Sequence, residues 1–164
     1  MYNYIDKMLA ELPSDMNGAS TTPAALHLFN VDDGKEKLDN DKAQLFHHLV
    51  TKLLYLSQRS RQDIQTSVAF LCNRVKSPDM DNYKKLARVI KYIHSTRDIT
   101  LTIEAVDEPN WWVDSSYSVH PDMRIHSGIF MILVKGTVYS TSSKQKLNTN
   151  SSTEAELVAI DDSM

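Results

Sequence analysis

The chain has 164 residues, of which 41% are hydrophobic and 24% charged, and its formal net charge is -3. This composition is typical of one folded domain of ordinary size or two small ones, and the slightly acidic balance gives no whole-chain signal for nucleic acid. The single cysteine, Cys72, excludes an intramolecular disulfide and a zinc site built from cysteines, and no stretch approaches the ~18 consecutive apolar residues of a membrane helix.

The N-terminal part combines a weak helical pattern with several turn signals. Residues 1–12 favour a short helix that ends at Pro13. The turn-like stretches "LPSDMNGASTTP", "VDDG" and "LDND" follow before residue 41. We therefore expect residues 1–40 to form a surface segment with little regular structure.

Helical periodicity dominates from residue 41 to residue 98. Leucines recur at helical spacing in 42–57, and a second helix is predicted over 62–76. Ser77 and Pro78 then provide a cap and a first helical position for a third helix, residues 78–95. Its apolar stripe consists of Tyr83, Leu86, Ile90 and Ile93.

A row of basic residues lies beside that apolar stripe. Lys84, Arg88 and Lys91 stand at i, i+4 and i+7 on the third helix. A solvated helix face is one interpretation of such a row. The other interpretation is a set of contacts to nucleic-acid phosphates. Because the chain is acidic as a whole, any binding of nucleic acid would have to come from such a local cluster of basic residues.

After residue 98 the hydrophobic period changes from helical to alternating. Strands are predicted over 99–105, 110–118, 125–134 and 136–143, with Gly136 supplying the last turn. The final stretch begins a helix, because Ser151 and Glu154 form the S-x-x-E capping box. The sequence thus predicts an α+β fold, with a helical region followed by antiparallel strands and a helix.

Two carboxylates are candidates for a metal site. Asp114 ends the bulky run "WWV" and is followed by small residues, which leave room for a hydrated cation. Glu156 lies near the start of the last helix and shares a face with Ala159 and Ile160, so we expect it towards the packed side. A buried carboxylate needs a partner, and Mg²⁺ prefers oxygen ligands. The alternative is that both are unrelated surface acids.

The strings "WWVDSSYS" and "SSKQKLNTNSSTEAELVAID" resemble the ribonuclease H domain of Ty1/copia-type retrotransposon Pol polyproteins. Upstream, "LLYLSQRSRQDIQTSVAFLCNRVKSPDMDNYKKLARVIKYI" resembles the segment between the polymerase palm and ribonuclease H of the same polyproteins. The resemblance covers residues 42–164. Beside the irregular segment expected over 1–40, it implies a helical connection or thumb-like region over 41–98 and a partial ribonuclease H-like domain over 99–164. That domain would be a three-stranded antiparallel meander plus the first helix.

The resemblance also implies residue roles. Asp114 matches the first-strand aspartate of ribonuclease H, and Glu156 matches its helix glutamate. In the parent enzyme these acids belong to a two-metal Mg²⁺ site that cuts the RNA strand of an RNA–DNA hybrid. Further hybrid contacts are expected at Ser115, Ser116, Lys144 and Lys146. The implied partners are nucleic acid and the rest of the polyprotein, without a membrane, in a cytoplasmic retrotransposon particle or in the nucleus.

The pattern is incomplete. The family places a further aspartate after the glutamate helix and the polymerase aspartate pair before the helical region, and neither is present in residues 1–164. We therefore expect the isolated chain to be inactive and of marginal stability, although its parent would be an enzyme. The alternatives are a nucleic-acid-binding module without catalysis and an inert remnant of a decayed element.

Overall fold

The computed structural model describes residues 1–32, 34–104, 108–133 and 135–163. The chain divides into two compact units. The helical unit comprises Met1–Leu28 and Asp32–Thr100, and the sheet unit comprises Phe29–Val31 and Leu101–Met164. Each unit has its own core.

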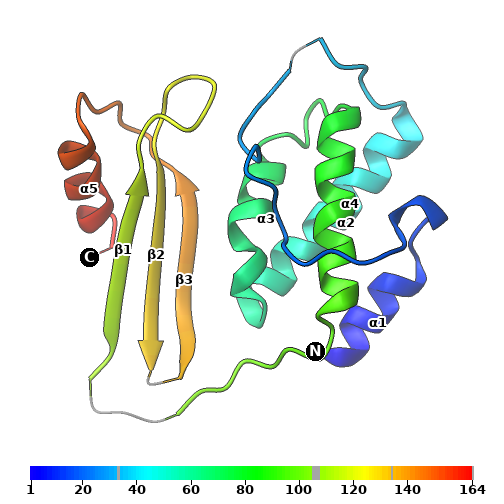
Figure 1. Ribbon diagram of the computed structural model, residues 1–164, viewed down its shortest axis with the longest axis horizontal. Helices are drawn as coiled ribbons and strands as arrows, with labels where there is room; N and C mark the ends of the chain where they lie inside the picture. The colour runs from blue at the N-terminus through cyan, green and yellow to red at the C-terminus, as the bar shows by residue number, and fades with distance from the viewer. Residues whose placement is uncertain (33, 105–107, 134, 164) are drawn as a thin grey trace. The chain divides into compact units, whose positions relative to one another are not determined.

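The helical unit contains four α-helices and two short 3₁₀ helices in its described residues (Figure 1). Their bounds are α1 Tyr2–Ala10, a 3₁₀ helix Ser14–Met16, α2 Asn40–Arg59, a 3₁₀ helix Gln62–Ile64, α3 Gln65–Cys72 and α4 Met80–Ser95. Apart from the 3₁₀ helix, the described residues between α1 and α2 have little regular structure. None of the helices in the described ranges has both the length and the apolar character of a membrane span.

The apolar faces of α2, α3 and α4 form the core of this unit. On α2, Leu49, Leu53 and Leu56 are buried as the leucine spacing predicted, whereas Leu45 is half-buried. On α4, the expected stripe of Tyr83, Leu86, Ile90 and Ile93 is buried throughout. Burial of each such side chain contributes about 1.5–3 kcal/mol, so this core supplies the main stabilisation of the unit.

The region between α3 and α4 differs from the prediction. α3 ends at Cys72 rather than near residue 76, and Ser77 does not cap α4. The cap is Asp79, whose side chain accepts a hydrogen bond of 2.8 Å from the Asn82 backbone N–H. Pairing with the segment 36–38 explains the shift, because Pro78 accepts from the backbone of that segment and Met80 donates to it. This pairing keeps residues 78 and 79 extended.

A buried arginine connects the ends of the main helices. Arg61 is only 1% exposed, and its guanidinium donates to both carboxylate oxygens of Asp63 at 2.7–3.2 Å. The same group donates to the Thr96 carbonyl oxygen and hydroxyl at 3.0 and 2.7 Å and lies over the Tyr92 ring. Since Arg61 follows α2 and Thr96 caps α4, one side chain holds the two helix ends together.

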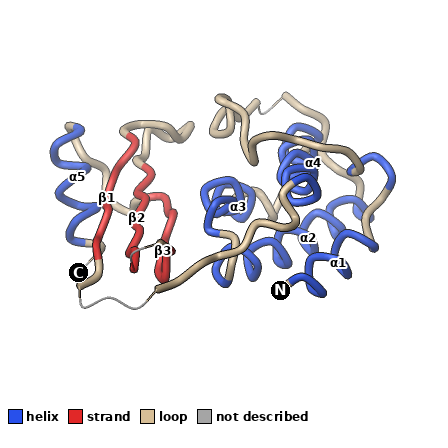
Figure 2. The backbone as a smooth tube through the Cα atoms, turned by 60° about the horizontal axis from the view of Figure 1, so that its bottom comes forward, coloured by secondary structure: helices blue, strands red, loops and turns tan. Residues whose placement is uncertain are grey.

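The sheet unit contains a three-stranded antiparallel sheet in the order β1-β2-β3 (Figures 1 and 2). The strands are β1 Asn110–Ser116, β2 His126–Leu133 and β3 Gly136–Lys144. Asp114 lies opposite Gly128, which lies opposite Ser142. A bulge falls in β3, because Met131 pairs with Tyr139 whereas Ile132 pairs with Thr137. Among the described strands, none pairs with the outer edge of β1.

Two details of the strand prediction are wrong. The described part of 99–105 contains no strand, and residue 105 lies outside the described residues. The segment instead approaches the sheet at one point, where the Thr102 backbone lies so close to Gly136 that a Cβ there would clash. Gly136 is therefore needed for this close approach, and it begins β3 rather than forming the turn.

Helix α5, Ser152–Asp161, follows the sheet and packs mainly against β1. Its start confirms the predicted cap at Ser151, but Glu154 accepts from the residue before the cap rather than from the cap residue itself. Ser151 accepts from the Glu154 N–H at 3.1 Å, and the Glu154 carboxylate accepts from the Asn150 N–H at 2.7 Å. Ala155 and Ala159 are its fully buried residues, so its buried face is narrow and small.

Replacing Arg61 tests the role of the buried guanidinium. We expect Arg61→Ala to lower the free energy of unfolding of the helical unit by about 1.5–3 kcal/mol, because it removes the hydrogen bonds to Asp63 and leaves the Thr96 carbonyl oxygen without its donor. The matched control is Arg59→Ala, an exposed arginine two residues away, for which we expect a change within about 0.5 kcal/mol. Urea unfolding followed by helical circular dichroism measures both. Equally small losses of unfolding free energy in the two variants would contradict the structural role of Arg61.

Candidate functional site

The predicted metal ligand Asp114 lies in β1 and is exposed. Side chains of a strand alternate between the two faces of its sheet. Asp114 therefore shares one face with Trp112 and Ser116, while Val113 and Ser115 lie on the other.

Helix α5 covers the face opposite to Asp114. Gln145 donates from Nε2 to the Ser127 hydroxyl at 2.7 Å and to the Ala155 carbonyl oxygen at 3.0 Å, which connects the sheet to the helix. Ser127 pairs with Ser115, so both belong to the covered face. Asp114 consequently points to the side of the sheet that α5 leaves open.

Glu156 does not lie on the packed side of α5, contrary to the prediction. Its side chain is exposed, as are Leu157 and Ile160. The reason is that two alanines at i and i+4, Ala155 and Ala159, make the contact with the sheet, and Glu156 is turned about 100° away from Ala155.

Together these placements do not form a metal centre. The two acids are of the right chemical type for Mg²⁺, but both are exposed and Asp114 faces away from the helix-covered side. Within the described ranges no group of three or more His, Cys, Asp or Glu side chains is arranged to hold a metal ion. Among the described residues, neither Asp114 nor Glu156 therefore belongs to a group of three such ligands.

The remaining predicted hybrid contacts are dispersed on the sheet unit. Ser115 is half-buried on the covered face, and Ser116 is exposed on the other face. Lys144 forms an ion pair of 2.5 Å with Asp122, which reduces its availability for a phosphate. Lys146 is exposed after the end of β3.

The predicted basic row on α4 has a more favourable setting. Lys84 is exposed, and Arg88 and Lys91 are half-buried. In the part of the chain that the structure describes, none of the three forms an ion pair. Three cations without acidic partners on one helix make a local positive surface on an otherwise acidic chain.

Residues before α2 lie along this basic row. Arg88 Nη2 donates to the Thr22 hydroxyl at 2.8 Å, and the Lys91 side chain lies against Gly18. A hollow of about 410 Å³ adjoins Lys84, Arg88 and Lys91. The hollow leaves all three cations accessible, although the segment 18–22 partly covers Arg88 and Lys91.

A buried chain of polar side chains in the sheet unit was not predicted. His120 Nε2 lies 3.0 Å from His126 Nδ1, and His126 Nε2 lies 2.7 Å from the Ser142 hydroxyl. Both histidines are 6% exposed and contact the Phe29 ring, at centroid distances of 5.0 and 5.2 Å. The only signal in the sequence was a pair of histidines, one on each side of the turn "PDMRI". Periodicity alone does not predict that these histidines lie near Ser142.

The geometry of this chain favours neutral histidines. Only one proton fits between the two facing ring nitrogens, so the rings cannot both be protonated there. Burial, reinforced by His120, lowers the pKa of His126 to about 4. Burial and then the Lys144 charge lower the pKa of His120, while Asp122 opposes them.

Comparison with known proteins gives no match, because no family model, no curated protein and no solved structure is similar enough to this chain.

The histidine chain predicts an acid-sensitive sheet unit. The unfolded state binds more protons than the folded state between the ordinary histidine pKa of ~6.5 and the folded value of about 4. Stability is therefore complete above pH 6.5 and declines as the pH falls towards 4, by up to roughly 3 kcal/mol for His126. Fluorescence of Trp111 and Trp112, the two tryptophans of the chain, follows the unfolding of this unit specifically.

The control for this prediction is His126→Gln, which keeps hydrogen-bonding groups but does not titrate. We expect the stability difference between the natural chain and this variant to narrow from pH 7 to pH 4.5. A difference that stays constant over this range would contradict the prediction.

Proposed function

We propose that this chain is a fragment of a copia-type retrotransposon Pol polyprotein, from its reverse transcriptase and ribonuclease H region, and that it does not cut RNA alone. Two separate sequence blocks, "RQDIQTSVAFLCNRV" and "SSTEAELVAI", support this lineage because they occur in the order that the family has. The order of helices, a three-stranded meander and a capped helix is compatible with it.

The placement of the two acids supports the second half of the proposal. In the parent, Asp114 and Glu156 would act on Mg²⁺ together with further carboxylates. In the described residues each of them is exposed without a third acid beside it. Positioning of both metals and the attacking water is what such catalysis requires. The isolated chain therefore lacks a preorganised reaction centre.

A second candidate function, non-catalytic binding of nucleic acid, is favoured by the unpaired cations of α4. Lys84, Arg88 and Lys91 offer up to three phosphate contacts on a surface that the segment 18–22 leaves accessible. Such contacts release counterions and are independent of base sequence. An RNA–DNA hybrid is the expected partner under the lineage proposed above.

Incubation with a labelled RNA–DNA hybrid and Mg²⁺ tests the inactivity of the chain. We expect the hybrid to stay intact over hours at micromolar protein, because the acids are not assembled. Asp114→Asn is the control for contaminating nuclease, which would cut equally with either protein. Cleavage by the natural chain that disappears in Asp114→Asn would overturn the proposal of inactivity.

Charge removal tests the binding function. We expect the triple Gln variant of Lys84, Arg88 and Lys91 to reduce the slope of log K against log salt by about 2–3, at roughly 0.7–0.9 per phosphate contact. The matched control is a triple Gln variant of Lys7, Arg59 and Lys76, which are exposed cations elsewhere on the helical unit. Equal losses in the two variants would show that only net charge matters.

A further inference from the structure

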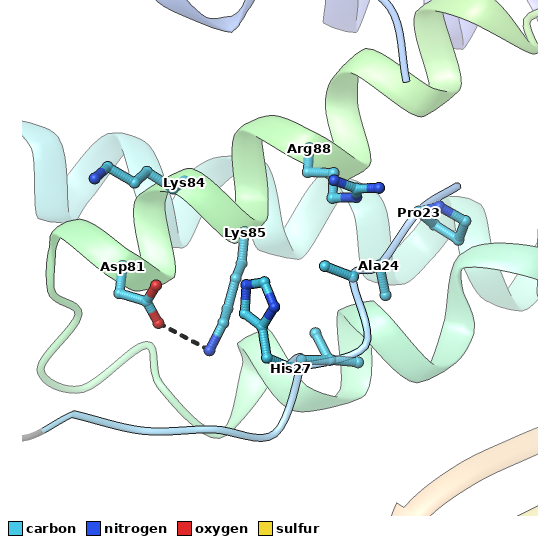
Figure 3. Close-up of a pocket in the computed structure, with 9 residues that line it drawn as sticks. Pro23, Ala24, His27, Asp81, Lys84, Lys85 and Arg88 are labelled. Atoms are coloured by element: carbon cyan, nitrogen blue, oxygen red, sulfur yellow. Dashed lines mark ion pairs between the residues drawn. The ribbon is translucent and has the colours of Figure 1, made fainter. Parts of the chain in front are cut away.

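A small hollow lies between the segment 23–28 and helix α4 (Figure 3). Its volume is about 210 Å³, which corresponds to about seven water molecules at ~30 Å³ each and is below the usual range for drug-sized ligands. Pro23, Ala24 and Leu28 form an apolar wall, and α4 contributes charged side chains. The space suits a compact group of five to ten atoms.

The charged lining has an excess of positive charge. Lys85 forms an ion pair of 2.8 Å with Asp81 and lies 4.7 Å above the Phe70 ring, so the one acid of the lining is already neutralised. Lys84 and Arg88 add two cations that form no ion pair among the described residues. His27 adds a ring that Figure 3 places next to Lys85.

Arg88 has unused hydrogen-bonding capacity at this place. Its Nη2 donates to the Thr22 hydroxyl at 2.8 Å, which fixes the guanidinium beside Pro23 and Ala24. Its Nε is buried and has no hydrogen-bond partner in the described structure. Because this Nε is closed to solvent, a ligand in the hollow would meet the outer guanidinium nitrogens of Arg88, and N–H groups of a guanidinium suit an anionic oxygen.

We propose that this hollow binds the terminal phosphate of a phosphate monoester. A monoester carries a charge of about -1.5 to -2 with three acceptor oxygens, which matches the two cations of the lining that form no ion pair, Lys84 and Arg88. An internal phosphodiester has one negative charge and two bulky substituents, so it fits a hollow of this size less well. The proposal does not depend on the retrotransposon lineage or on hybrid binding.

The phosphate monoester could belong to a free small molecule or to the end of a nucleic acid, and the choice of ligand distinguishes the two. Adenosine monophosphate and inorganic phosphate represent free small molecules, and a short oligonucleotide with a 5′-phosphate represents a nucleic-acid end. Its 5′-hydroxyl counterpart is the control. Heteronuclear NMR titration of the full chain reports binding at residues 23–28 and along α4, at constant ionic strength.

We expect saturable shifts with adenosine monophosphate, and at least tenfold weaker binding for both Arg88→Gln and Lys84→Gln. Arg88→Gln also loses the hydrogen bond to Thr22, which could disturb the segment 18–28. Lys84 is exposed, so Lys84→Gln keeps the fold and tests the site without that effect. Ala24→Phe should fill the hollow and abolish binding. Unsaturable shifts, or equal affinity in Lys84→Gln, would overturn the proposal.

Lys91→Gln separates this inference from the nucleic-acid proposal. Lys91 belongs to the basic row but does not line this hollow. We expect the variant to weaken hybrid binding and to leave monophosphate binding within twofold. Conversely, Ala24→Phe should lose monophosphate binding and keep the salt-dependent binding of hybrid. Parallel losses of both activities in both variants would contradict a separate monoester site.

Discussion

The helical unit depends on the buried guanidinium of Arg61. Burial alone would raise the pKa of Asp63, but the hydrogen bonds and charge of Arg61 lower it, so the pair is ionic in the folded state. The remaining donors of Arg61 go to Thr96 at the end of α4. The helix α4, which carries the basic row and lines the hollow, is thus joined to the end of α2 by this side chain.

The two units differ in how they hold their polar groups. The helical unit buries a charged arginine with matched partners. The sheet unit buries neutral groups instead, through the His120–His126–Ser142 chain and through Gln145, which contacts both sheet and helix. Acid therefore acts on them differently: the histidines gain charge that burial disfavours, whereas Asp63 keeps its charge to lower pH than an ordinary aspartate.

Periodicity and capping chemistry predicted most helices and the three strands of the sheet. The α4 stripe and the Ser151 cap were correct because they depend on local spacing. The predicted cap at Ser77 failed because a distant segment, residues 36–38, pairs with the chain there. The predicted strand is missing from the described residues 99–104 for a similar reason, since alternation indicates an extended segment but does not supply a neighbouring strand. The prediction that Glu156 is buried was wrong because the fully buried residues of α5 are Ala155 and Ala159, and Glu156 lies outside that face.

The edge of β1 that pairs with no described strand has a consequence for the chemistry of Asp114. Half of the backbone N–H and C=O groups of this strand point away from β2, and backbone pairing is indifferent to side-chain identity. Any extended polypeptide that docked there would contribute its own residues on either side of Asp114. The chemical role of this carboxylate would then depend on the side chains of the docked polypeptide. The same strand could take part in different reactions with different partners.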